Sequence, residues 1–253
     1  MFEAGSSGKM GAGQENCMKK TLLKIWDAIK EFVIVIALTT FVVSFPGVSG
    51  NSMMPTLRTG ERMVIPKYET WMHRMGIGSF QRGDIVVFKP PADHKASWRA
   101  FPTDQMTLWH FIPYYVKRVV AVSGDTVRIE EGRVYVNNKE VDFQTIENYW
   151  QAQGCWDNSP ESITANFIRA DAEKQLVKKT FKVPEGEYFL MGDNRSEYGS
   201  SDSRAFGSVP LDRIAGRVGY IVFPFWRKTN ASGGCDDQLV NLSGGLELNL
   251  RQP

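Results

Sequence analysis

One serine in this chain lies where nucleophilic chemistry could take place. Ser52 is part of residues 51–57, NSMMPTL, which lie just past an apolar run. A serine hydroxyl becomes a strong nucleophile only when a neighbouring group takes its proton. The same stretch also fits a simple loop, because serine favours turns and Pro55 restricts the residue before it. Ser52 alone therefore leaves both interpretations open.

A lysine is the stronger candidate for the proton acceptor. The three histidines of the chain show no motif-like spacing, and each fits a surface or packing position. Lys117 lies within the β-prone residues 114–122, YYVKRVVAV. Burial lowers the pKa of a lysine, so a desolvated Lys117 can be neutral and accept a proton. In a strand, Lys117 and Arg118 face opposite sides, and Lys117 also fits the polar side of a half-buried strand.

A third polar group follows the apolar residues 188–191. It consists of Gly-Asp-Asn-Arg at 192–195 and Ser-Ser-Asp-Ser-Arg at 200–204. Such a loop can orient a base through a hydroxyl and hold its own shape through an Asp–Arg pair. It fits a hydrogen-bonded turn equally well.

The elements that must position these groups are predicted to be mainly β. Short β-prone stretches alternate with Gly- and Pro-containing turns, a pattern typical of an antiparallel barrel or sandwich. These stretches are residues 62–66, 85–88, 114–122, 126–129, 133–136, 188–191 and 216–222. Residues 130–132 are predicted to form a hairpin loop, and Asn137-Asn138 a turn.

Two stretches interrupt this β pattern. Residues 67–81 carry Trp71 and Met72 and fit a helix-like insertion or a surface patch near a membrane. Residues 143–180 are polar and weakly periodic, and they fit a second subdomain inserted between strands.

An apolar run near the N-terminus predicts a membrane anchor. Four lysines between residues 19 and 30 precede the uncharged residues 32–45, FVIVIALTTFVVSF. This run has about 14 residues, fewer than the usual ~20 of a spanning helix, and residues from Trp26 extend it. A cleaved signal peptide or a buried core element would look similar. We favour the anchor because cleavage near Ser49 would leave Ser52 at a frayed terminus. The preceding basic residues predict a cytoplasmic N-terminus.

The composition excludes several function classes. The chain has 253 residues and a net charge of +2, without the basic face of a dedicated nucleic-acid binder. It has no CxxC pair and no HExxH motif, so we expect no metal and no cofactor. Residues 1–17 fit a leader or a mis-assigned start, with Met18 as the alternative first residue.

The motifs together resemble those of the bacterial type I signal peptidases, membrane-anchored Ser-Lys peptidases of family S26. Four motifs occur in the family's order, at residues 51–57, 82–88, 115–120 and 192–204. The resemblance runs from the apolar run to Val222 and leaves residues 143–180 and both ends poorly matched. It implies an N-terminal transmembrane helix followed by an antiparallel β-barrel or sandwich catalytic domain with an inserted subdomain.

The resemblance also suggests domain boundaries. The expected segments are a cytoplasmic segment 1–24, an anchor 25–46, a catalytic β domain in two parts (47–142 and 183–226), an inserted subdomain 143–182 and a C-terminal tail 227–253. In this topology Cys155 and Cys235 both face the oxidising side, so a disulfide between them is an open alternative.

Each motif implies roles for its residues. By resemblance, Ser52 would be the nucleophile and Lys117 the general base. Ser200 matches the serine that orients the lysine, while Asp202 and Arg204 match a structural ion pair behind the site.

The substrate side of the site follows from the same motifs. Met53, Tyr115 and Val116 would line the wall that receives small side chains of the substrate. The oxyanion hole would be formed at Ser52 and Gly50. Gly50 stands where many members carry a hydroxyl residue, so this hole would rely on backbone N–H groups.

The loop after Arg195 departs from the family pattern. Residues 196–199 lengthen the gap before Asp202. Ser201 or Ser203 could therefore take the role assigned to Ser200.

The implied activity is the removal of signal peptides from exported preproteins after small residues, through an acyl-enzyme on Ser52. Preproteins, membrane lipid and the Sec export machinery are the implied partners, with no nucleic acid. The catalytic domain would lie on the outer face of the cell membrane. Apolar residues expected to rest on lipid are Trp71, Met72, Trp98, Phe101 and Trp109. The alternatives are a self-cleaving repressor-type Ser-Lys peptidase and a non-enzymatic membrane-tethered assembly protein.

Overall fold

The computed structural model describes residues 12–92, 99–102, 107–130, 132–156, 180–196, 199–228 and 246–248. The chain divides into two compact units, residues 1–43 and residues 44–253. Trp98, Cys235 and most of the predicted tail lie outside the described residues, as does the side chain of Trp109.

The first unit is helical. It contains α1 (Ala12–Ala37) and the π-helix η1 (Leu38–Val42), so the apolar run is helical as far as Val42. The chain then becomes extended in β1 (Val43–Ser44). Among the described residues, no helix has both the length and the apolarity needed to cross a membrane. The anchor over residues 25–46 stays a prediction.

The second unit is mainly β, and every strand pairing that the structure describes within it is antiparallel. This confirms the predicted fold class at the level of mainly β, antiparallel structure. The strands are β2 (Arg62–Pro66), β3 (Ile85–Phe88), β4 (Arg99–Pro102), β5 (Thr107–Phe111), β6 (Tyr115–Ala121), β7 (Thr126–Glu130), β8 (Arg133–Val136), β9 (Lys139–Glu140), β10 (Thr180–Lys182), β11 (Glu187–Met191), β12 (Val209–Pro210), β13 (Ile214–Arg217), β14 (Tyr220–Phe223), β15 (Trp226–Lys228) and β16 (Leu246–Leu248).

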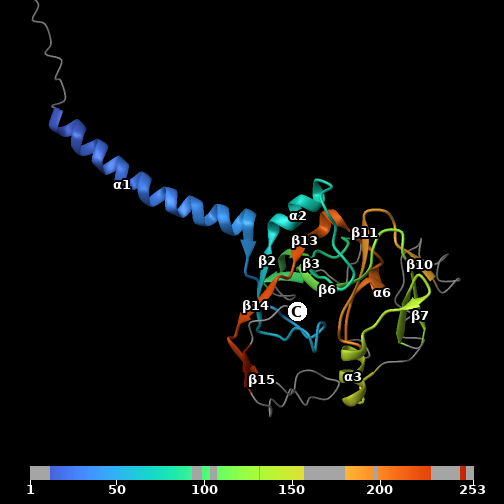
Figure 1. Ribbon diagram of the computed structural model, residues 1–253. Coiled ribbons are helices and arrows are strands. Elements are labelled where there is room, and N and C mark those ends of the chain that lie inside the picture. Colours follow the sequence, from blue (N-terminus) through green and yellow to red (C-terminus); the bar gives the residue numbers. More distant parts are fainter. Residues whose placement is uncertain are drawn as a thin grey trace, which may run out of the picture. The chain divides into compact units, whose positions relative to one another are not determined.

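Short helices interrupt the strands (Figure 1). They are α2 (Lys67–Arg74), α3 (Gln144–Ala152), α6 (Ser203–Phe206) and the 3-10 helix η3 (Leu211–Arg213). Helix α2 confirms the helical insertion predicted after residue 66, and its Trp71 and Met72 side chains are exposed, as is Phe101. Helix α3 lies in the predicted inserted subdomain, whose residues 157–179 are outside the described part. The predicted subdomain, residues 143–182, ends with β10, which pairs with β7.

The central sheet has the strand order β12-β11-β6-β3-β13. Strand β6 lies between β11 and β3 and packs into three apolar clusters, through Val116, Val119 and Val120. Its β-branched residues suit a strand that is packed on both sides. Lys117, which β6 carries, is therefore held on a rigid element.

The hairpin predictions are confirmed. Strands β7 and β8 pair from Val127 opposite Val136 to Glu130 opposite Arg133, so Glu130 belongs to the strand. Asn137 and Asn138 have φ angles of 53° and 64°, and both precede β9. A two-residue turn of type I′ requires positive φ at both positions, which asparagine tolerates.

The prediction of one strand over residues 216–222 is wrong. The structure has two strands in different sheets, β13 paired with β3 and β14 paired with β2. Between them, Val218 N–H donates to Ile85 O and Gly219 N–H donates to Val64 O. A Cβ on Gly216 would lie 2.4 Å from Ile65 Cγ2, so glycine lets the chain pass close to β2. The apolar pattern continues from β13 into β14, so the sequence gives no sign that the chain changes sheets there.

Candidate active site

The structure brings Ser52 and Lys117 together. Lys117 Nζ lies 2.5 Å from Ser52 Oγ, although 65 residues separate them in the sequence. Lys117 Nζ also donates to Val116 O at 3.0 Å, and the lysine is 3% exposed. The turn at residues 51–54, named the nucleophile turn after the predicted role of Ser52, is closed by Met54 N–H donating to Asn51 O at 3.0 Å. A hydroxyl and a buried amine in contact have the geometry that proton transfer requires.

Burial makes the Lys117 amine easier to deprotonate than that of an ordinary lysine. Loss of solvent lowers the pKa of Lys117 from 10.5 to about 8. The carboxylates of Asp202 and Asp193 raise this pKa and the guanidinium of Arg204 lowers it, but desolvation is the largest effect. With this pKa, about a tenth of Lys117 is neutral at pH 7, and the neutral fraction rises as the pH approaches 8.

The strand geometry explains this burial. In β6, Lys117 is paired with Val86, and the Tyr115 ring centroid lies 5.6 Å from Lys117 Nζ. Tyr115 and Val116 are half-buried, next to the lysine. Met53, by contrast, is 2% exposed and belongs to an apolar core cluster. Met53 thus packs in the core, and its part in substrate binding stays a prediction.

Asp202 and Arg204 form a two-pronged ion pair. Arg204 Nε donates to Asp202 Oδ1 and Arg204 Nη2 to Asp202 Oδ2, each at 2.8 Å. Gly192 N–H and Ser200 Oγ also donate to Asp202 Oδ2, at 2.9 and 2.7 Å. Despite complete burial, which raises it, the pKa of Asp202 is lowered to about 2, because Arg204 and these donors favour the carboxylate. The predicted ion pair is thus present in the geometry.

The serines of the loop differ in their contacts. Ser203 Oγ accepts a hydrogen bond of 2.9 Å from the main-chain N–H of Leu190 in β11, so this hydroxyl binds the strand. Ser200 Oγ contacts Asp202 and lies where a Cβ on Gly192 would be 2.2 Å away. Among the described residues, the hydrogen bonds of Lys117 Nζ go to Ser52 and Val116. Orientation of the lysine by Ser200 stays a prediction.

The backbone at Gly50 suits glycine. Its φ angle is +94°, and no atom lies within 4 Å of the position that a Cβ would occupy. A side chain there would meet backbone strain, not a steric clash. The oxyanion hole at Ser52 and Gly50 is a prediction that the geometry leaves open.

Sequence reasoning missed a link on the other face of β6. Arg118 Nε and Nη2 donate to the carboxylate of Asp193 at 2.9 and 2.6 Å, and Thr56 Oγ1 donates to the same carboxylate at 2.5 Å. Asn194 N–H donates to Ser52 O at 3.1 Å. These contacts join the nucleophile turn to residues 192–204. The strand alternation at Lys117 and Arg118 indicated opposite faces, but nothing indicated Asp193 as the partner.

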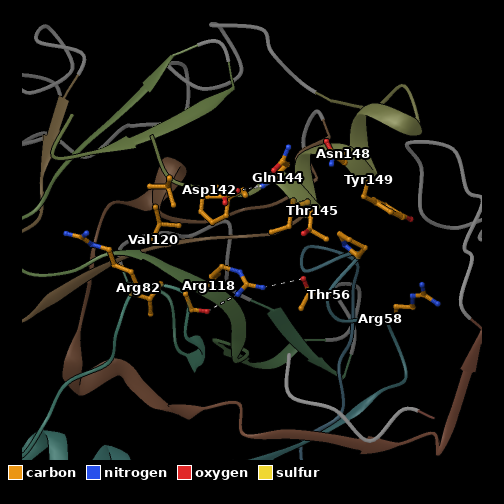
Figure 2. Close-up of a pocket in the computed structure, with 16 residues that line it drawn as sticks. Thr56, Arg58, Arg82, Arg118, Val120, Asp142, Gln144, Thr145, Asn148 and Tyr149 are labelled. Atoms are coloured by element: carbon orange, nitrogen blue, oxygen red, sulfur yellow. Dashed lines mark hydrogen bonds between the residues drawn. The ribbon is translucent and has the colours of Figure 1, made fainter. Parts of the chain in front are cut away.

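Figure 2 shows the groove on this side. Its volume is about 940 Å³, and Thr56, Arg118 and residues of α3 such as Thr145 line it. Two of the three lining arginines, Arg82 and Arg118, are paired with carboxylates, of Asp125 and Asp193. Ser52 and Lys117 do not line the groove. It is distinct from the place where the serine and lysine meet.

A mainly β domain that holds a serine hydroxyl against a buried lysine has the features of a serine peptidase. The family profile described as "Signal peptidase, peptidase S26" matches residues 24–226. The chain therefore belongs to the S26 family of signal peptidases, serine peptidases that cleave signal peptides.

Individual relatives agree with this membership. Signal peptidase IB of Staphylococcus aureus strain Mu50 is 34% identical over 212 residues, covering 82% of this chain and 93% of that protein. Signal peptidase I of Bacillus licheniformis is 32% identical over 222 residues, covering 84% and 95%. A crystal structure of a signal peptidase I from Enterococcus faecalis V583 aligns with 56% of this chain and 97% of its own, with 24% identity and a TM-score of 0.37.

Proposed function

We propose that this chain is a membrane-anchored endopeptidase that removes signal peptides through an acyl-enzyme on Ser52, with Lys117 as general base. The observation that carries this proposal is the 2.5 Å contact between Ser52 Oγ and the buried Lys117 Nζ. Membership of the signal peptidase family supplies the substrate class, exported preproteins.

The proposed reaction begins with neutral Lys117. Its Nζ takes the proton of Ser52 Oγ while Oγ attacks the scissile carbonyl carbon. The tetrahedral intermediate collapses, the C–N bond breaks, and protonated Lys117 gives its proton to the leaving amine. Lys117, neutral again, then takes a proton from water, whose oxygen attacks the acyl carbon. The bond between this carbon and Ser52 Oγ breaks, protonated Lys117 returns its proton to Oγ, and the signal peptide leaves with a free carboxyl group. No step needs a metal or a cofactor.

The loop 192–204 supports this chemistry in the proposal. The Asp202–Arg204 ion pair fixes the loop behind Lys117, and Ser200 is held against Asp202. The Ser52 N–H would stabilise the oxyanion, with the open backbone at Gly50 beside it. Tyr115 and Val116 would form the wall for small substrate side chains, and Met53 would support this wall from the core.

The setting of the reaction is part of the proposal. The helical apolar run before β1 would anchor the chain, with the N-terminus in the cytoplasm and the catalytic domain on the outer face. Membrane lipid and the Sec export machinery would then be neighbours. The exposed apolar side chains of Trp71 and Met72 would rest on the lipid surface.

A cleavage assay tests this proposal. The full chain, purified in detergent, is incubated with a preprotein that carries small residues before its cleavage site. We expect loss of at least about a thousandfold in kcat for Ser52→Ala and for Lys117→Ala. Lys139→Ala, which truncates an exposed lysine, should cleave at the wild-type rate. Full activity in either of the first two variants would contradict the mechanism.

A further inference from the structure

Helix α3 contacts the nucleophile turn. Ile146 and Trp150 of α3 are buried in one apolar cluster with Met54, which is two residues after Ser52. The spacing of Ile146 and Trp150 places them on one face of the helix. Trp150 is 1% exposed, so its ring is a fixed part of this cluster.

The same tryptophan contacts the loop on the other side of the site. Trp150 Nε1 donates a buried hydrogen bond of 2.8 Å to the carbonyl oxygen of Asp193. Buried indole N–H groups normally need such an acceptor, and a buried carbonyl that loses its donor is costly. Trp150 therefore fixes one peptide group of the loop 192–204.

The peptide group between Asp193 and Asn194 lies among the contacts that connect the loop to Ser52. The side chain of Asp193 accepts hydrogen bonds from Thr56 and Arg118. The next residue, Asn194, donates its N–H to Ser52 O. A shift of the Asp193 peptide would thus reach the main chain of Ser52 directly.

A second contact ties the start of α3 to the same loop. The Arg195 guanidinium lies 4.6 Å from the ring centroid of Phe143, which precedes α3. Arg195 is 4% exposed, and its Nε and Nη2 have no hydrogen-bond partner in the described part of the chain. The aromatic face is thus a specific contact for this buried cation.

We propose that α3 is a positioning element for the active site, and that Trp150 is a positioning residue that keeps Ser52 within reach of Lys117. This inference rests on the proposed function, because it assumes that the Ser52–Lys117 contact is catalytic. The role of residues 143–152 follows from these contacts with the nucleophile turn and with the loop 192–204.

The test is a kinetic comparison of Trp150→Phe with the wild type, in the full chain. Phenylalanine keeps an aromatic ring in the cluster but removes the N–H that holds Asp193. We expect kcat to fall about tenfold, as for the loss of one buried hydrogen bond, with KM changed less than twofold. The matched control is Trp226→Phe, the same change at an exposed position, which should retain wild-type kcat and KM.

The outcomes separate positioning from folding. The kinetics are measured well below the thermal midpoint of each variant, and acylation of Ser52 by a small activated ester is followed by mass spectrometry. Slower acylation and lower kcat at unchanged KM support the inference. A Trp150→Phe enzyme that is only less heat-stable, with wild-type kcat and acylation, overturns it. If the wild type is acylated at Ser52 but cleaves no preprotein, the proposed function fails while acylation still tests Trp150.

Discussion

The main-chain N–H of Asn194 donates a hydrogen bond of 3.1 Å to the carbonyl oxygen of Ser52. The Asn194 side chain also donates to Asn51 O, at 3.3 Å. The position of Ser52 is thus set by a loop more than a hundred residues later in the sequence. The candidate site depends on this long-range contact as much as on the turn that carries Ser52.

We predict that Gly192→Ala disrupts the site. An added Cβ would lie 2.2 Å from Ser200 Oγ and 2.4 Å from Ser52 O, so the nucleophile turn or the loop must move. Overpacking of this kind typically costs about 1–3 kcal/mol in stability. We expect at least about a hundredfold loss of kcat, because misplacement near 1 Å has that effect. Gly47→Ala, whose Cβ would have its nearest neighbour at 3.9 Å, is the control and should be active.

The activity should rise with pH. Lys117 must be neutral to act as a base, and burial lowers its pKa to about 8. We expect kcat/KM to rise with pH up to about pH 8 and to level off above it, in a profile measured with an uncharged peptide substrate. A flat profile between pH 6 and 9 would contradict the role of Lys117.

Lys117 should also limit stability at neutral pH. Because its pKa is lower in the folded than in the unfolded chain, the unfolded chain binds more protons between pH 8 and 10.5, so the stability contribution of Lys117 rises across that window. Below pH 8 the folded state holds a buried cation. We expect Lys117→Met to be inactive yet more stable than the wild type at pH 7, as measured by urea unfolding. Equal or lower stability of the variant would count against this desolvation.

Replacement of Asp202 should affect both structure and acid–base chemistry. Asp202→Asn removes the charge that holds Arg204, and breaking a buried pair typically costs about 3–5 kcal/mol. Asp202 also raises the pKa of Lys117, so the residual activity should have its pH midpoint at a lower value than the wild type. The exposed Asp212→Asn is the control. A midpoint shifted to higher pH would argue against this electrostatic contribution.

Reduction of the Cys155 disulfide should weaken the support of the site. Cys155 is disulfide-bonded and packs in the same cluster as Trp150 and Met54. Its partner lies outside the described side chains, so pairing with Cys235 stays a prediction. Loss of a native disulfide typically costs about 2–5 kcal/mol. We expect dithiothreitol to lower the thermal midpoint and kcat of the wild type, while leaving Cys155→Ser, already lower in both, unchanged.

Local sequence patterns predict much of the catalytic β domain. β-branched runs with Gly and Pro boundaries match β2, β3, β6, β7, β8 and β11 closely. Its β-prone surroundings make Lys117 a candidate base for Ser52, but only the family resemblance favours this role over a structural one for either residue. Alternation along β6 correctly separates Lys117 from Arg118.

What the sequence hides is long-range pairing. Asp193 and Arg118 are 75 residues apart, and no local pattern links them. The apolar pattern runs without a break from β13 to β14, although the two strands belong to different sheets, so the pattern predicts one strand where there are two. Likewise, the polar residues 143–156 gave no sign that Trp150 would reach the loop beside Ser52, because a single hydrogen bond to a main-chain carbonyl leaves no periodic signature.

The groove between α3 and the Arg118 face of β6 is not lined by Ser52 or Lys117, so a ligand bound there would not occupy the proposed catalytic pair. A small molecule bound between Thr56 and α3 would leave the proposed position of the scissile bond, at Ser52, unobstructed. By forcing α3 away from the nucleophile turn, it would lower the turnover rate and leave substrate affinity intact. Such non-competitive inhibition would be hard to overcome by accumulated preprotein.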